Sequence, residues 1–333
     1  MMKRKRLLFL GLLLPVVGLL WALRSAASWR PQLFGVQKDD ATWCILSPDG
    51  HLLLASSSGN SGNVNFWDVE KQRRLWGTVA DWPVMFSANS QMVALVRGLQ
   101  KYDSGIRTLK GTHFDMVEAR SGRVLRSLGD SNSKDADRDD DICFYGFSSD
   151  SHEFRVATSH RLRSWNIDNG KLLTVIRWKP NSQNKFSSVL HGQFSTDGKT
   201  LFAGLSSNGS RTIGVFDVGT AQLLRVLPVG VDASDFDVSP DGYSIWTEDN
   251  NQVKSFRISD GKSLWPSSVF PIFSFDGKTA YVRGKRGIDV FDAHTGRKWN
   301  HLSGLGENVF TLSPNGNWLY EARDGKIWKW RAR

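Results

Sequence analysis

Cysteine is among the scarcest residues in this chain. Its 333 residues include only two, Cys44 and Cys143. A chain of this length can bury a core large enough to need neither disulfides nor a structural metal. One bridge is possible in an oxidising compartment, but it requires the two Cα atoms to lie within about 7 Å of each other. We expect two small buried hydrophobic side chains instead.

Recognisable catalytic signatures are also missing. The seven histidines are dispersed and form neither an HxH nor an HExxH pair, and the chain contains no Gly-x-Ser-x-Gly elbow and no phosphate-binding glycine loop. An enzyme can still assemble its site from scattered loop residues. We therefore name no catalytic residue and favour a protein that is not an enzyme, while leaving that question open.

The N-terminus carries a long hydrophobic run. A basic stub at 1–6 precedes an uncharged apolar segment at 7–23, and a linker follows at 24–31. Seventeen helical residues reach about 25 Å, enough for a short membrane span. We predict an apolar helix that acts as an uncleaved single-pass anchor. The alternative is a signal peptide cleaved near Ala27. Either way the four cations stay cytoplasmic and the rest of the chain is exported.

The net charge of +10 is unevenly distributed. Five of the positive charges belong to residues 3–6 and to Arg24, and residues 278–333 hold eleven Lys or Arg against five Asp or Glu. These cations do not alternate with aromatic residues in a tract, so we expect no nucleic-acid partner. We hypothesise that they face an anionic membrane surface.

Short apolar runs separated by turn residues make up the rest of the chain. Residues 41–76 contain four such runs, rich in β-branched or aromatic residues and bounded by Gly, Pro, Asn or Asp. This pattern predicts four β-strands, and the spacing of an amphipathic helix is absent. The chain also contains 14 Trp, which suits packing between stacked sheets.

The four-strand unit recurs seven times. A turn of the type Ser-Pro-Asp-Gly separates the first two strands of each copy. These turns begin at Ser47, Ser87, Ser148, Ser195, Ser239, Ser274 and Ser313. An aromatic or apolar residue followed by a polar one ends each third strand. These pairs begin at Trp67, Val117, Trp165, Phe216, Phe256, Phe291 and Trp330.

These units resemble WD40-type and YVTN-like repeats, and the fourth-strand segments at 259–265 and 292–299 also resemble quinoprotein-like propellers. The resemblance covers nearly everything after residue 30. It implies an all-β chain in which residues 32–333 form a seven-bladed β-propeller of four-stranded antiparallel blades, preceded by one N-terminal apolar helix.

Closure of the ring can be predicted from the two ends of the repeat region. The seventh unit stops after three strands, and residues 32–36 have the composition of a strand. We predict that residues 32–36 supply the last strand of blade seven. This pairing would fasten the two ends of the domain and remove free sheet edges.

The longest loops are expected on one face of the propeller. They connect second to third strands or one blade to the next, and they lie at 56–63, 97–112, 129–141, 178–185 and 206–211. Long loops on a rigid scaffold commonly carry binding residues. We therefore predict partner-binding residues in the two loops of the long second interval. The candidates are Arg97, Lys101, Tyr102, Arg107, Asp130, Asp140 and Asp141.

The acidic loop at 130–141 raises the question of a cation. Asp135, Asp137 and Asp139 have the alternate spacing of calcium-binding loops, but Asp140 replaces the expected glycine and Gly146 the expected glutamate. Calcium is one hypothesis. A solvated loop, or one that contacts a basic partner, is the alternative. We expect no other cofactor.

Two functions remain after these observations. The first is a monomeric, non-catalytic scaffold that is tethered to the membrane and presents its loop-rich face to a protein or a surface polymer. The second is an exported lactonase-like hydrolase with a metal or carboxylate site on the axis. We favour the first, because no catalytic constellation can be named.

Overall fold

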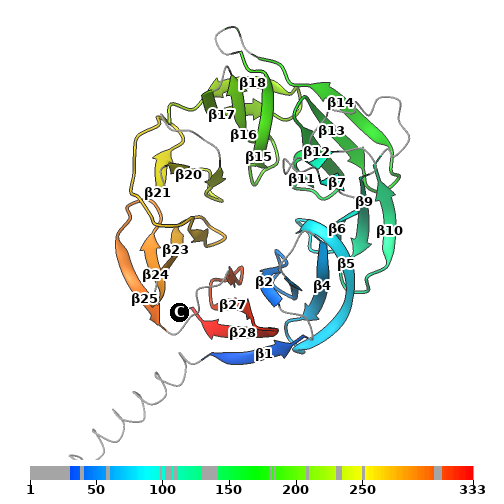
Figure 1. Cartoon of the computed structure of the whole chain (residues 1–333), viewed down its shortest axis with the longest axis vertical. Coiled ribbons are helices and arrows are strands. Elements are labelled where there is room, and N and C mark those ends of the chain that lie inside the picture. Colours follow the sequence, from blue (N-terminus) through cyan, green and yellow to red (C-terminus); the bar gives the residue numbers. More distant parts are fainter. Residues whose placement is uncertain are drawn as a thin grey trace, which may run out of the picture.

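The chain folds into an all-β propeller whose seven blades surround a central axis (Figure 1). The computed structural model describes residues 31–37, 41–57, 61–97, 100–101, 107–108, 112–129, 142–180, 182, 185–207, 210–229, 235–249, 252–284, 286–303 and 310–332. In each blade the first strand lies nearest the axis and the last strand lies at the rim.

The strands of the first four blades follow the predicted order. Blade one has β2 (Ala41–Leu46), β3 (Leu52–Ser57), β4 (Ser61–Asp68) and the first part of β5 (Arg73–Phe86). Blade two has the rest of β5, β6 (Met92–Arg97), β9 (His113–Glu118) and β10 (Val124–Leu128), and the hairpin of β7 (Gln100–Lys101) and β8 (Arg107–Thr108) lies between β6 and β9 in the chain. Blade three has β11 (Ile142–Phe147), β12 (Glu153–Thr158), β13 (Arg161–Asn166) and β14 (Leu172–Arg177), and blade four has β15 (Ser188–Phe194), β16 (Thr200–Ser207), β17 (Ser210–Asp217) and β18 (Gln222–Val226).

The remaining blades complete the circle. Blade five has β19 (Phe236–Val238), β20 (Ser244–Asp249) and β21 (Gln252–Arg257); blade six has β22 (Ile272–Phe273), β23 (Thr279–Gly284), β24 (Gly287–Asp292) and β25 (Lys298–Ser303); blade seven has β26 (Phe310–Leu312), β27 (Trp318–Arg323), β28 (Lys326–Arg331) and β1 (Gln32–Val36).

Blades one and two share a continuous strand. The 14-residue β5 pairs with β4 through its first part and with β6 through its last residues, so one seven-stranded sheet joins the two blades. The register shifts between Asp81 and Met85, where the strand passes from one blade to the next. The two blades are therefore coupled by backbone as well as by side-chain packing.

Blade five departs from the predicted four strands. Its described sheet contains β19, β20 and β21, and the segment after β21 forms only isolated bridges at Ser263 and Ser267. Pro266 lies between these serines. Proline has no N–H to donate to a ladder, so a regular fourth strand cannot run through it.

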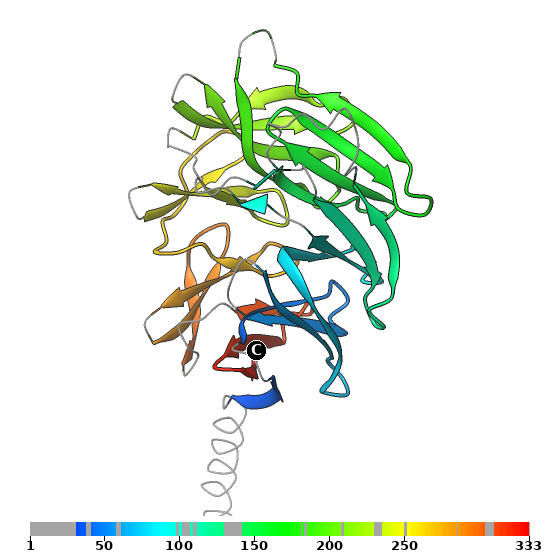
Figure 2. The ribbon, with the colours of Figure 1, turned by 45° about the vertical axis from the view of Figure 1, so that its right-hand side comes forward.

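The predicted ring closure is confirmed. β1 pairs antiparallel with β28 as the outermost strand of blade seven, and it lies beside the C-terminal strands (Figure 2). Phe34 is buried and lies 5.4 Å from Tyr320 and 6.2 Å from Trp67, measured between ring centroids. One β1 side chain thus joins blade seven to blade one.

The repeated serine turn has a structural role that explains its recurrence. Ser47 Oγ donates to Asp49 Oδ1 at 2.6 Å and accepts from the Leu52 N–H at 2.9 Å. The other six turns begin with a buried or half-buried serine that makes the same two bonds, except that blades two and seven use Asn in place of Asp and the blade-four turn is more exposed. Each turn therefore fixes the connection between its first two strands.

Two turns end in serine instead of glycine, and the difference links blades. Gly50 has a φ of 74°, while Ser90 and Ser151 adopt the same left-handed region at 60° and 63°. Ser90 Oγ accepts from the Asp49 N–H at 3.0 Å, and Ser151 Oγ accepts from the Asn89 N–H at 3.1 Å. The hydroxyls offset the backbone strain by joining blades one, two and three.

Two tryptophans, Trp76 on β5 and Trp265 in the segment after β21, also connect neighbouring blades. Trp76 Nε1 donates to the Ala119 carbonyl of blade two at 2.9 Å, and Trp265 Nε1 donates to the Ala293 carbonyl of blade six at 2.9 Å. Trp76 also stacks on Phe66 with ring centroids 3.9 Å apart. These tryptophans therefore pack between sheets, as the sequence predicts.

The two cysteines do not form a disulfide. Cys44 is buried and donates to the Tyr320 carbonyl, and Cys143 donates to the Val189 carbonyl at 3.1 Å. Burial raises the pKa of the Cys44 thiol far above its usual range, so this group stays protonated. The prediction of a buried side chain is confirmed for Cys44, whereas Cys143 is only partly buried.

The N-terminal predictions lie outside the described residues. The stub at 1–6, the apolar segment at 7–23 and nearly all of the linker at 24–31 belong to this part of the chain. Within the described ranges, no helix is long and apolar enough to cross a membrane.

Candidate functional site

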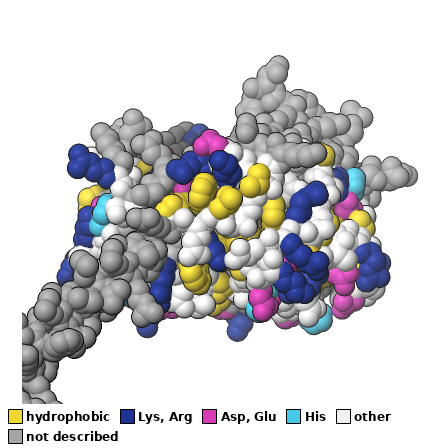
Figure 3. All heavy atoms as spheres, turned by 90° about the horizontal axis from the view of Figure 1, so that it is seen from below, with side chains coloured by type: hydrophobic (Ala, Val, Ile, Leu, Met, Phe, Trp, Pro, Cys, Tyr) yellow, Lys and Arg dark blue, Asp and Glu magenta, His cyan; other side chains and the backbone are white. Residues whose placement is uncertain are grey.

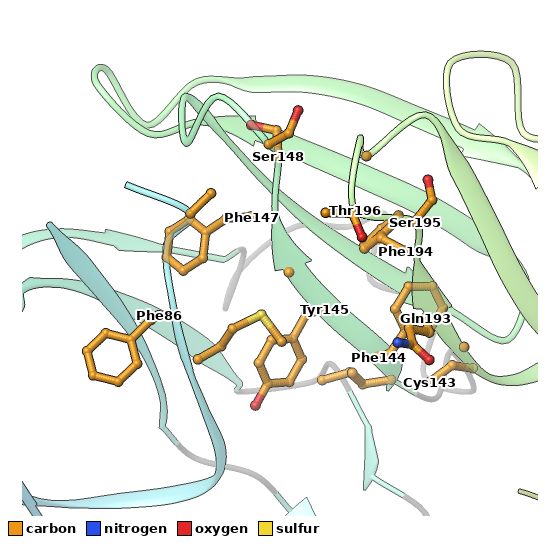
Figure 4. A pocket seen from close by; sticks show the side chains of 17 residues that line it. Phe86, Cys143, Phe144, Tyr145, Phe147, Ser148, Gln193, Phe194, Ser195 and Thr196 are labelled. Atoms are coloured by element: carbon orange, nitrogen blue, oxygen red, sulfur yellow. The ribbon is translucent and has the colours of Figure 1, made fainter. Parts of the chain in front are cut away.

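An apolar cavity of about 410 Å³ lies where the inner strands of blades two, three and four approach the axis. Figure 4 shows Phe86 and Phe147 on one side of it, and Phe194 and Gln193 on the other. The lining residues are Met85, Phe86, Ala88, residues 142–149, residues 192–196 and Gly198. The turns after β5, β11 and β15 contribute Ala88, Ser149 and Thr196 to its rim. The cavity thus reaches the face that carries the short turns.

Glycines and phenylalanines from adjacent blades shape this cavity. A Cβ added to Gly192 would lie 2.5 Å from Cε1 of Phe144, and one added to Gly146 would lie 3.3 Å from Cδ2 of Phe194. The rings of Phe144 and Phe194 meet edge to face, with centroids 5.0 Å apart. Each glycine therefore makes room for a ring of the neighbouring blade, and the rings supply the apolar walls.

Most polar groups at the cavity are already engaged. Gln193 Oε1 accepts from the Val238 N–H at 2.9 Å, and its Nε2 donates to the Val238 carbonyl at 3.3 Å. Ser148 and Ser195 donate to the aspartates of their own turns. The hydrogen bond from the Ser148 hydroxyl lowers the pKa of Asp150. This bond stabilises the turn, and a carboxylate with a lowered pKa is a poor base for activating a serine nucleophile. The arrangement suits an apolar or aromatic group.

A separate pair of titratable residues lies on the inner strands of blades four and five. Burial raises the pKa of Asp237 on β19 to about 6, and burial lowers the pKa of His191 on β15. The His191 ring packs against Phe236 with centroids 4.5 Å apart, and its Nε2 is buried without a hydrogen-bond partner. Neither side chain lines the apolar cavity.

Arg97, a predicted partner-binding residue, is engaged within the propeller. Its Nε lies 3.3 Å from Asp115 Oδ2, one terminal nitrogen donates to Thr78 Oγ1 at 3.1 Å, and the other donates to the Val79 carbonyl. These contacts tie β6 to β9 and to β5. Arg97 therefore supports the base of the loop that follows it.

The other predicted binding residues are only partly described. Lys101 and Arg107 are opposite each other in the β7–β8 hairpin, whose backbone alone is described. Tyr102, Asp130, Asp140 and Asp141 lie outside the described residues, as do the calcium candidates Asp135, Asp137 and Asp139. In the described parts of the chain, no group of three or more His, Cys, Asp or Glu side chains could hold a metal ion.

The cavity was not predicted from the sequence. The available signal was a glycine close to the phenylalanine that ends two first strands, at Gly146–Phe147 and Gly192–Phe194; the other first strands contain no glycine near this end. Which rings face which glycines depends on how neighbouring blades pack. That arrangement cannot be obtained from one strand alone.

Comparison with known proteins supports the fold and goes no further. No family model matches the sequence, and no curated protein matches it. Among solved structures, the chain is similar to Kuenenia stuttgartiensis hydrazine synthase, with a TM-score of 0.59 at 17% identity over 89% of this chain and 97% of that one. It is also similar to the β-propeller domain of Myceliophteria thermophila Cps50 (Swd1), with a TM-score of 0.62 at 12% identity over 91% and 100%. These likenesses place the chain in the class of seven-bladed β-propellers.

Proposed function

We propose that this protein is a non-catalytic interaction scaffold, exported and tethered to a membrane by residues 7–23, that binds a partner protein through its axial cavity. The observation that carries this proposal is the apolar cavity between blades two, three and four. Its size fits one or two side chains of a partner, since drug-sized ligand pockets begin at about 300 Å³.

The lining of the cavity favours binding over acid–base chemistry. Its walls are aromatic, and Cys143 and Tyr145 are the titratable residues among those that line it. Aromatic pockets that exclude water are the usual place for the anchoring residues of an interface. A short partner segment with an exposed Phe, Leu or Trp is therefore the class of ligand that we infer.

The exposed Phe275 adds support for a partner on the short-turn face. It occupies the second position of the blade-six turn and is 64% exposed. Ala88 holds the same turn position in blade two, at the rim of the cavity. A partner that covers this face would bury Phe275 while it places its own apolar side chain in the cavity.

A rim variant tests the proposal in the full chain. Ala88→Arg places a cation at the mouth of the cavity without changing the core, because Ala88 is exposed. Gln72→Arg is the matched control, since it adds the same charge at an exposed turn of blade one on the same face. We expect photo-crosslinking in membranes of the native host to recover a partner with the wild type and with Gln72→Arg, but not with Ala88→Arg.

Cys143 provides a second readout at the same cavity. It lines the cavity and is only partly buried, whereas Cys44 is buried. Partner binding should slow alkylation of Cys143 by a maleimide. Partner recovery that is equal for all three proteins, with unchanged Cys143 alkylation, would reject the cavity as the binding site. Shortening residues 129–141 tests the loop-rich face in the same assay: loss of the partner would assign binding to that face instead.

A further inference from the structure

The rim where the ring closes exposes apolar side chains. On β1, Leu33 is 50% exposed and Val36 is 60% exposed, and on β25 of the neighbouring blade Trp299 is 47% exposed. Figure 3 looks at this rim and shows hydrophobic side chains along its middle, with Lys and Arg side chains around them. An exposed outer strand with apolar side chains invites association, so something is expected to cover this one.

Cations lie next to these apolar residues. The register of β1 and β28 places Val36 opposite Lys326 and Gln32 opposite Lys329. Lys326 and Arg331 are exposed. Directly paired side chains project to the same side of a sheet, so the charge of Lys326 lies beside the apolar surface of Val36.

Blade six continues the same pattern. Arg297 and Lys298 are exposed immediately before Trp299. Lys298 Nζ contacts Asp289 at 2.7 Å, which partly offsets its charge. Asp324 is the strongly exposed carboxylate of blade seven, with 88% of its side chain accessible. Among the described residues of this rim, Arg297, Lys298, Lys326, Lys329 and Arg331 outnumber Asp289 and Asp324, so the described part of the rim carries a positive charge.

The length of chain before β1 limits where this rim can lie. The apolar segment ends at residue 23, and eight residues separate it from Gln32. A fully extended chain spans at most about 3.6 Å per residue, so these eight residues reach about 29 Å. If residues 7–23 cross a bilayer, the start of β1 must remain within that distance of its surface.

We propose that the rim formed by β1, β28 and β25 rests on the surface of an anionic bilayer. This inference depends on the membrane tether of the proposed function. Trp299 and the apolar side chains of β1 enter the interfacial layer, and the neighbouring cations contact anionic headgroups. The cavity and the short-turn face then point along the membrane, where a partner can reach them.

A second stretch of the rim, away from β1, is an internal control. Val124 and Leu125 on β10, and Leu172, Leu173 and Val175 on β14, are also 41–52% exposed. These strands belong to blades two and three, on the right and upper right of the ring, whereas β1 lies at the bottom (Figure 1). General hydrophobic adhesion would protect both stretches of the rim from exchange. Tethered docking would protect only the stretch beside residue 31.

The test measures amide hydrogen exchange of the full chain in nanodiscs. The lipids are phosphatidylcholine alone or mixed with phosphatidylglycerol. We expect protection of β1 and β25 to rise with phosphatidylglycerol and to fall at high salt, because 1 M salt shortens the screening length to about 3 Å. Protection of β10 and β14 should not change.

Paired variants separate charge from fold. Lys326→Gln with Arg331→Gln should reduce the added protection of β1 on the order of 25-fold, since each cation near an anionic surface contributes about fivefold. Lys171→Gln with Arg177→Gln removes two exposed cations at the ends of β14 and should leave it unchanged. Equal effects of the two pairs would overturn the proposal.

The experiment distinguishes docking from the tether on which it depends. Retention of the chain in membranes through alkaline extraction, without lipid-dependent protection of β1 and β25, would reject docking while the tether stands. Release by alkaline extraction would reject both. Cavity binding is measured separately by Cys143 alkylation, so it can hold in either case.

Discussion

Asp237 should make the propeller less stable as pH rises. It lies on β19, the inner strand of blade five, and its pKa is raised from 3.8 to about 6, chiefly by burial and further by the nearby Asp235. Hydrogen bonds from the Val238 N–H and from Gln193 act in the opposite direction. Above pH 6 the fold therefore holds a carboxylate that would be better solvated in the unfolded chain.

The sign and size of this effect follow from proton linkage. Between pH 3.8 and 6 the folded state keeps a proton that the unfolded state has released, so the free energy of unfolding falls as pH rises through this window. A shift of about 2 pKa units corresponds to at most about 3 kcal/mol above pH 6. Below pH 3.8 both states are protonated, and the penalty vanishes.

The variant Asp237→Asn removes the charge and keeps a side chain of similar shape. We expect it to raise the free energy of unfolding by about 1–3 kcal/mol at pH 8 and to change it little at pH 4. Urea denaturation of the full chain at both values, followed by tryptophan fluorescence, measures this difference. Glu70→Gln, on an exposed turn of blade one, is the control and should be neutral at both.

One result would refute this reasoning. If Asp237→Asn destabilised the propeller at pH 8 by as much as at pH 4, the carboxylate would be a stabilising partner in the native state and not a buried charge with a raised pKa. Asp237 would then be an ionised carboxylate near the axis, which would support the alternative of a hydrolase with a carboxylate site there.

Three further predictions concern the contact that closes the ring, the repeated turn within a blade and a hydrogen bond between two blades. Phe34→Ala should lower the free energy of unfolding by about 3–5 kcal/mol, because it empties the space beside Tyr320 that closes the ring, and differential scanning calorimetry measures the loss. Ser47→Ala should cost about 1–3 kcal/mol, since a buried N–H loses its acceptor; urea titration checks it, and a neutral result would remove the role assigned to the repeated turn. Trp265→Phe keeps the ring packing but loses the bond to the Ala293 carbonyl, and should cost about 1 kcal/mol in the same titration.

Much of the architecture could be predicted from local sequence. Each serine turn is a short-range device whose hydrogen bonds join residues two and five positions apart, so Ser47 and its counterparts are visible in any single copy. Counting the copies predicts the number of blades. The missing strand after Arg331 and the spare strand at β1 predict the closure, because an unpaired edge has one available partner.

The sequence was less informative where long-range packing or a single residue intervenes. Pro266 interrupts the fourth strand of blade five, although the surrounding residues match the repeat. The sequence predicts Arg97 as a loop residue, whereas it ends β6 and contacts Asp115 and Thr78 of neighbouring strands; its role in partner binding stays a prediction. The predictions for the acidic loop and for the N-terminal segment stay predictions.

The sequence by itself determined the repeat, its turns, the count of blades and the way the ends meet, because these depend on contacts between residues near one another in the chain or on the pairing of one free edge. Only the tertiary structure decided where the chain is hollow and which rim is both apolar and positive. The cavity exists because Gly192 faces Phe144 across two blades, and the rim exists because Val36 pairs with Lys326, almost three hundred positions away. Such juxtapositions depend on the register between blades, which no single repeat encodes.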